Sequence, residues 1–191
     1  MANEKLKGNE IATIDCTMVT FQGYEVDADE LLVETSNKIA VTIGTETTDA
    51  VKLIIKNKLI AQKPQQTVVT GNTIVLTDNV FNDKLVVMLQ GGTVTYEEDG
   101  KTFKKYVPPV AGSNVKLKIF KVNAYSAIYN AAGICTGYEK ITYPNCQGVP
   151  IAFSSEDGVF RVSEYTIISA PNTGEAPYEI EIVSALPEVT V

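Results

Sequence analysis

The residue types that carry most hydrolytic and metal chemistry are scarce in this sequence. It contains no His, which is the commonest general base near neutral pH and the commonest zinc ligand. Ser-His-Asp and Cys-His mechanisms and H-E-x-x-H metal sites are therefore excluded. Cys16, Cys135 and Cys146 form an odd set without C-x-x-C spacing, which predicts free thiols in a reducing cytoplasm.

Two short motifs resemble parts of catalytic sites. Ser113 and Lys116 have the Ser-x-x-Lys spacing of a serine nucleophile, but the companion Ser-Asp-Asn and Lys-Thr-Gly motifs are absent. Residues 97–99 are Glu-Glu-Asp, which crowds carboxylates on a turn instead of opposing them across a cleft. A solvated turn and a solvated lysine are the simpler interpretation of both.

A third motif resembles the start of a calcium loop. Asp27 and Asp29 have the right spacing, but Leu32 and Lys38 stand where the loop needs Gly and Glu. We therefore expect no catalytic residue, no metal ligand and no cofactor-binding residue, and we expect the protein not to be an enzyme.

The length and composition favour one ordered domain over residues 1–191. The hydrophobic fraction is 45% and the charged fraction 20%, as in ordinary globular proteins. Sixteen basic residues against 23 acidic ones give a net charge of −7, which disfavours binding of nucleic acid through its phosphates. The sequence has no apolar run long enough to indicate a signal peptide or a membrane span, so we expect neither.

The charges are segregated into blocks along the chain. Two blocks are basic: Lys52, Lys56, Lys58 and Lys63, then Lys101, Lys104, Lys105, Lys116, Lys118 and Lys121. Two are acidic: Glu25, Asp27, Asp29, Glu30 and Glu34, then Glu164, Glu175, Glu179, Glu181 and Glu188. Either these charges are simply solvated, or complementary patches meet between subunits. The first acidic block is our candidate inter-subunit patch.

Alternating and β-branched segments predict a chain that is mostly β. The expected strands are residues 11–21, 31–33, 39–43, 51–61, 66–70, 73–77, 93–97, 101–107, 115–119, 138–143, 149–153, 160–169 and 178–183. Residues 44–50 are expected to be a Thr-rich connector between a strand at 39–43 and its partner at 51–59. Gly71-Asn72 predicts a tight hairpin turn.

One helix is expected over residues 79–90, from Asn79 to Gln90. Its core face comprises Phe81, Leu85, Met88 and Leu89, which fall at i, i+4, i+7 and i+8. Thr77 or Asp78 would cap it, and Gly91-Gly92 would end it. The economical architecture is an antiparallel β-sandwich or barrel with this one flanking helix and with extended arms at residues 1–10 and 184–191.

Several segments resemble the major tail tube proteins of long-tailed bacteriophages and prophages. The most specific are ELLVETSN at 30–37, TGNTIVLTDNVF at 70–81 and LQGGT at 89–93. Weaker support comes from YPNCQG at 143–148, SAPN at 169–172 and PY at 177–178. The resemblance covers most of the chain.

The resemblance implies a structural function in a virion tail. Six subunits would join their sheets into a ring, and stacked rings would form a tube through which DNA passes without specific binding. Terminator and tape-measure proteins, and in some tails a sheath, would be further partners, and the protein would be made in the host cytoplasm. Six subunits of −7 carry about −42, which would repel DNA phosphates from the wall.

By analogy with tube proteins, one early hairpin is the candidate for lining the lumen. Its candidate residues are Ile39, Val41, Ile43, Lys52, Ile54, Lys56 and Lys58. The lysines could instead pair with acids of a neighbouring subunit. We expect the connector at 44–50 and both terminal arms to become ordered only on polymerisation.

Two alternative functions stay open. One is the inner tube of a contractile injection or type VI secretion apparatus, which shares the fold. The other is a monomeric β-sandwich that binds glycans on an aromatic platform. The aromatic residues available for it are Tyr96, Phe103, Tyr106, Tyr125, Tyr129 and Tyr138.

Overall fold

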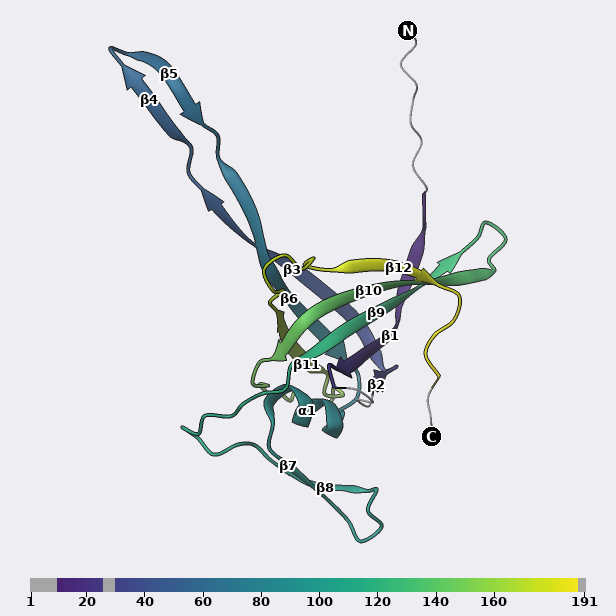
Figure 1. The fold of residues 1–191 in the computed structure, drawn as a ribbon. Helices are drawn as coiled ribbons and strands as arrows, with labels where there is room; N and C mark the ends of the chain where they lie inside the picture. Colours follow the sequence, from purple (N-terminus) through teal and green to yellow (C-terminus); the bar gives the residue numbers. More distant parts are fainter. Residues whose placement is uncertain (1–9, 26–29, 189–191) are drawn as a thin grey trace.

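The computed structural model describes residues 10–25 and 30–188, which form a mainly β fold with one helix (Figure 1). The strands are β1 (Thr13–Gly23), β2 (Glu30–Val33), β3 (Ser36–Thr48), β4 (Val51–Ile55), β5 (Lys58–Lys63), β6 (Gln66–Asp78), β7 (Thr93–Tyr96), β8 (Phe103–Val107), β9 (Phe120–Tyr129), β10 (Cys135–Gly148), β11 (Ser163–Ser169) and β12 (Glu179–Val183). The helix α1 spans Asp83–Gln90.

Eight strands form the main sheet, and every pairing in it is antiparallel. The order is β2-β1-β9-β10-β11-β6-β3, and β12 pairs with the first half of β10. Strand β3, at one end of this path, also contacts β1, which is next to the other end. This confirms the expected antiparallel β-sandwich with a single flanking helix.

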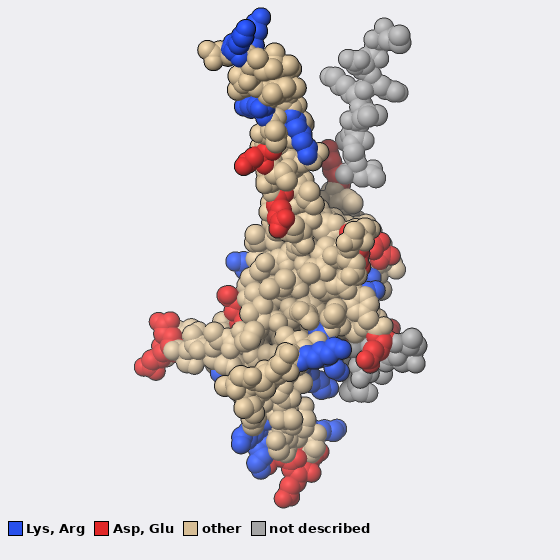
Figure 2. Space-filling model, turned by 60° about the vertical axis from the view of Figure 1, so that its left-hand side comes forward, with Lys and Arg blue, Asp and Glu red and all other residues tan. Residues whose placement is uncertain are grey.

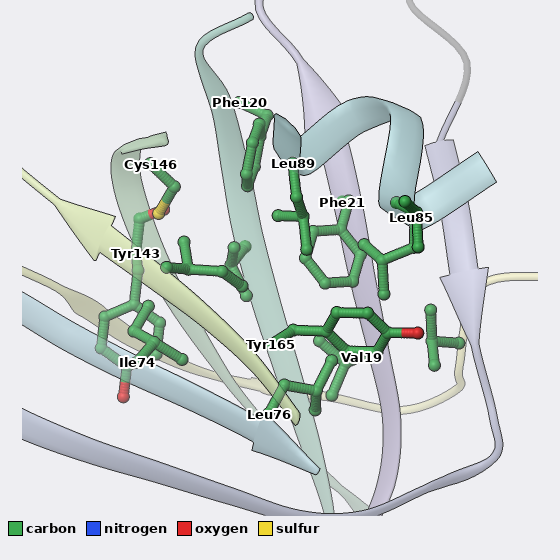
Figure 3. Packing of buried hydrophobic residues seen from close by; sticks show 14 residues of the cluster. Val19, Phe21, Ile74, Leu76, Leu85, Leu89, Phe120, Tyr143, Cys146 and Tyr165 are labelled. Carbon is green, nitrogen blue, oxygen red and sulfur yellow. The ribbon is translucent and has the colours of Figure 1, made fainter. Parts of the chain in front are cut away.

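The core lies between the inner faces of this sheet and α1 (Figure 3). Inward residues alternate along β6 and β11: Ile74 and Leu76 on one strand, Tyr165 and Ile167 on the other, are all buried. The rings of Phe21 and Phe120 meet edge to face, with 5.8 Å between their centroids. The helix contributes the buried side chains of Leu85 and Leu89 to this core.

The helix is shorter than the sequence predicts. It begins at Asp83 because the Asn82 side chain accepts a hydrogen bond from the backbone N–H of Leu85 at 3.0 Å, so Asn82, not Thr77 or Asp78, is the N-cap. Phe81 therefore precedes the helix, although it and Met88 still pack against the core. Leu85 and Leu89 are buried as expected, and the helix ends at Gly91, with φ 75°.

The expected connector at residues 44–50 is wrong. Residues 44–48 continue strand β3, which stays paired with β6 as far as Thr48 and Gln66. Thr47 and Thr67 join their hydroxyls across this ladder at 3.2 Å. The β-branched threonines that suggested a loop extend the strand instead.

The expected hairpin turn at Gly71-Asn72 is also wrong, because both residues lie inside β6. A Cβ on Gly71 would lie 2.4 Å from the carbonyl oxygen of Ser169 on β11. Glycine is present here for close approach of two strands and not for a turn. The buried Asn72 side chain donates to the carbonyl oxygen of Pro177 at 2.7 Å.

The tight turn of this long hairpin lies at Lys56-Asn57. Both residues have positive φ, 47° and 63°, as a two-residue turn between twisted strands requires. The expected pairing of residues 39–43 with 51–59 is therefore wrong: β3 pairs with β6, and β4 with β5.

Two strand predictions fail elsewhere, because residues 115–119 and 149–153 form no strand. The strand predicted at 160–169 is present as β11, but it begins at Ser163. Conversely, β9 runs through residues for which no strand was predicted. The β7–β8 hairpin is confirmed.

Candidate assembly surface

A long hairpin arm projects from the sheet (Figure 1). We define the arm as residues 45–70, which comprise the end of β3, all of β4 and β5, and the start of β6. Every residue in it is exposed except Ala50, which is half-buried. The arm thus leaves the core entirely and is held only by its own two-stranded pairing.

Both faces of the arm carry large apolar side chains. These are Val51, Leu53, Ile54, Ile55, Leu59, Ile60, Val68 and Val69, each 44–65% exposed. Leu53, Ile54 and Ile55 are consecutive, and neighbouring side chains of a strand point to opposite faces. An isolated two-stranded ribbon is marginally stable in water, and a contiguous apolar surface marks an interaction site. Covering each side chain would contribute on the order of 1 kcal/mol.

The charges of the arm are separated along its length. Lys56 lies in the end turn and Lys58 beside it, whereas Glu46 and Asp49 lie near the root. Figure 2 shows blue lysines at the outer end and red carboxylates below them. Among the described residues, the only ion pairs are Lys104–Glu97 at 3.0 Å and Lys140–Glu181 at 3.5 Å. The arm's charges are therefore available to a partner.

The residues predicted to line a lumen all lie on this one hairpin, but not in one environment. Ile39 and Val41 lie at its base and pack against the core. Ile43 is 49% exposed at the root. Lys52, Ile54, Lys56 and Lys58 lie on the exposed arm. Only the outer part of the predicted set forms an open surface.

The predicted acidic patch is described in part. Glu25 and Glu34 are exposed, and Glu30 is half-buried at the start of β2. Burial and the nearby Glu30 carboxylate both raise the pKa of Tyr125. Asp27 and Asp29 lie outside the described residues.

The catalytic-looking motifs have ordinary structural contacts. The Ser113 hydroxyl donates to the carbonyl oxygen of Val110 at 2.6 Å within a turn. The Asp99 carboxylate accepts hydrogen bonds from Thr102 and from the Lys101 backbone, which lower its pKa. In the part of the chain that the structure describes, no three His, Cys, Asp or Glu residues gather in a group that could hold a metal ion.

The three cysteines are free thiols, as expected, but in different surroundings. Cys146 is buried in the core, and burial raises its pKa to about 12. Burial also raises the pKa of the half-buried Cys16. Cys135 is exposed at the start of β10.

We expect thiol alkylation to distinguish these sites. At pH 8, a pKa of about 12 leaves about one Cys146 thiol in ten thousand ionised, and only the thiolate reacts. Iodoacetamide should therefore modify Cys135 within minutes and leave Cys146 unmodified, as read by peptide mass spectrometry. In urea all three should react; equal labelling of Cys135 and Cys146 in the folded protein would contradict the prediction.

The aromatic residues considered for glycan binding do not form one platform. Tyr96, Phe103 and Tyr106 belong to the β7–β8 hairpin, whereas Tyr125, Tyr129 and Tyr138 belong to β9 and β10. Tyr125 is only 4% exposed. The Tyr96 hydroxyl donates to Asp83 at 2.8 Å, and that of Tyr106 donates to the carbonyl oxygen of Gly91 at 2.7 Å. Two of the first three rings therefore anchor their hairpin to α1.

The chain matches no family model, and no curated protein matches its sequence. Within the described residues, no helix is long and apolar enough to span a bilayer.

Proposed function

We infer that this protein is a structural subunit of a bacteriophage tail tube, which assembles with copies of itself into stacked hexameric rings that form a conduit for DNA. The observation that carries this proposal is the arm, because its two apolar faces lie in water in a single copy. The segments that resemble tail tube proteins include much of the base of this hairpin, at residues 70–81.

A second copy is the partner that best accounts for the arm. An apolar hairpin adds naturally to another sheet, where its backbone and side chains are both covered. A closed ring of such additions removes the exposed strand edges. In this proposal the protein acts in the virion tail after synthesis in the host cytoplasm, together with the proteins that start and terminate the tube.

Negative-stain electron microscopy together with light scattering tests the proposal. Purified protein should form rings or hollow tubes as its concentration rises, and the scattering should increase in parallel. A particle that stays monomeric at all concentrations, in low and in physiological salt, would overturn the proposal.

A further inference from the structure

Residues 114–119 have the sequence pattern of a strand but are not part of any sheet in the structure. Val115, Leu117 and Ile119 alternate with Lys116 and Lys118, which is the pattern of a half-buried strand. Outside the strand ladders, no backbone hydrogen bond joins residues 114–118 to another described residue. If another protein surface buries these backbone N–H and C=O groups, they must form hydrogen bonds with it, because an unpaired buried group costs free energy.

This segment is also loosely packed on its own chain. An open cavity of about 890 Å³ lies between it, the end of β1 and α1, lined among others by Tyr24, Met88 and Leu117. Val115 is 38% and Ile119 50% exposed. Lys116 and Lys118 make no ion pair with any residue that the structure describes.

Strand β12 offers a matching free edge. It pairs with β10 on one side only, and no other described strand pairs with it. Its apolar residues Ile180 and Ile182 are 55% and 51% exposed. They alternate with Glu179 and Glu181, which are exposed as well, and Glu181 also pairs with Lys140 of β10 at 3.5 Å.

The two segments are complementary in pattern and in charge. In an antiparallel register with Leu117 opposite Ile180, Lys116 faces Glu181 and Lys118 faces Glu179. Cross-strand pairs of opposite charge and of β-branched residues both stabilise a sheet. All four charged residues then lie on one face, and all apolar residues lie on the other.

Within one chain the two segments lie on opposite sides of β10. Residues 114–119 lead into β9, which borders one side of β10, whereas β12 borders the other. Figure 1 shows β12 at the upper part of the sheet and the connection after β8 beside α1 at the lower end. A pairing between them therefore joins two copies head to tail, the kind of contact that forms a ring when the rotation between copies closes and a filament when it does not.

We propose that residues 114–119 of one copy add to the free edge of β12 of the next copy, with Lys116 and Lys118 facing Glu181 and Glu179. This inference rests on the proposed self-assembly and names one of its contacts. It uses surfaces separate from the arm.

Reversed charges test the pairing. One variant carries Lys116→Glu and Lys118→Glu, and the other carries Glu179→Lys and Glu181→Lys; all four side chains are exposed. Each variant alone should need at least about tenfold more protein to assemble, because like charges then face each other. An equimolar mixture should assemble like the wild type, since every contact then joins opposite charges. The combined four-substitution protein should also assemble.

Several outcomes separate the two proposals. Restored assembly in the mixture also shows that both variants are folded. If the wild type assembles and either variant alone assembles equally well, the pairing is overturned while the tube proposal stands. If the variants fail and the mixture fails too, the pairing is likewise overturned. If the wild type itself never assembles, the proposed function and this pairing both fall.

Cross-linking gives an independent readout of the register. In a Cys135→Ser background, protein with Leu117→Cys is mixed with protein carrying Ile180→Cys and treated with a short bismaleimide. A dimer that contains one of each variant is expected on denaturing gels. The matched control replaces Leu117→Cys by Gly112→Cys, which lies outside the segment; equal yields from both mixtures would overturn the register.

Discussion

Removing the outer arm is expected to give a folded protein that no longer assembles. Thr48 and Gln66 are directly opposite in the ladder, so an Asn-Gly turn can join them in place of residues 49–65. The deleted residues contribute nothing to the core cluster, and their loss removes six of the eight large apolar side chains exposed on the arm. We expect the same monomer stability as the wild type and no rings at any accessible concentration.

Two measurements check this result. Urea unfolding at low concentration compares the stability of the two monomers, and electron microscopy at high concentration compares their assembly. A matched control keeps the arm but carries Ile54→Thr and Leu59→Thr, which oppose each other across β4 and β5. It retains β-forming residues and should shift assembly to higher concentration without abolishing it. If the trimmed protein still forms rings, the outer arm is not needed for assembly and the prediction is wrong.

The sequence predicts the fold class well because most strands obey one simple pattern. In β6 and β11, one face is buried and the other is open, so the inward residues Ile74, Leu76, Tyr165 and Ile167 alternate with less buried ones. The helix is also detectable, since Leu85 and Leu89 repeat at helical spacing. Its start is less predictable, because several of the preceding polar residues, Thr77, Asp78 and Asn82, are suitable caps.

Strand β9 escapes the pattern because both of its faces are covered. Val122, Asn123, Ala124 and Tyr125 are consecutive and all buried. Asn123 donates to Thr20 at 3.0 Å and accepts from Thr142 at 2.9 Å, which satisfies its amide between two neighbouring strands. A buried, hydrogen-bonded Asn breaks the alternation of apolar residues, so the sequence gives no strand signal there.

The position of the arm's turn is predicted wrongly from the sequence for a different reason. Glycine has two uses, positive φ and close approach, and the sequence alone does not separate them. Gly71 serves close approach to Ser169, whereas the actual turn uses Lys56 and Asn57 at positive φ. The sequence therefore predicts a hairpin in this part of the chain but assigns it the wrong strand pairing and the wrong turn.

The largest single loss of monomer stability is expected for Phe21→Ala. Phe21 is fully buried and packs edge to face on Phe120, so its removal leaves a cavity in the centre of the core, at a cost of about 3–5 kcal/mol. The matched control is Phe160→Ala, the same chemical change at a side chain that is 94% exposed, with an expected effect within about 0.5 kcal/mol. Urea unfolding measures the stability of both variants at a concentration below assembly, because association would otherwise add to the apparent stability.

Equal losses for the two variants would contradict the position of Phe21 in the core. A large loss for Phe21→Ala with normal assembly of the remaining folded protein would show that the core supports the arm without itself forming the contacts between copies.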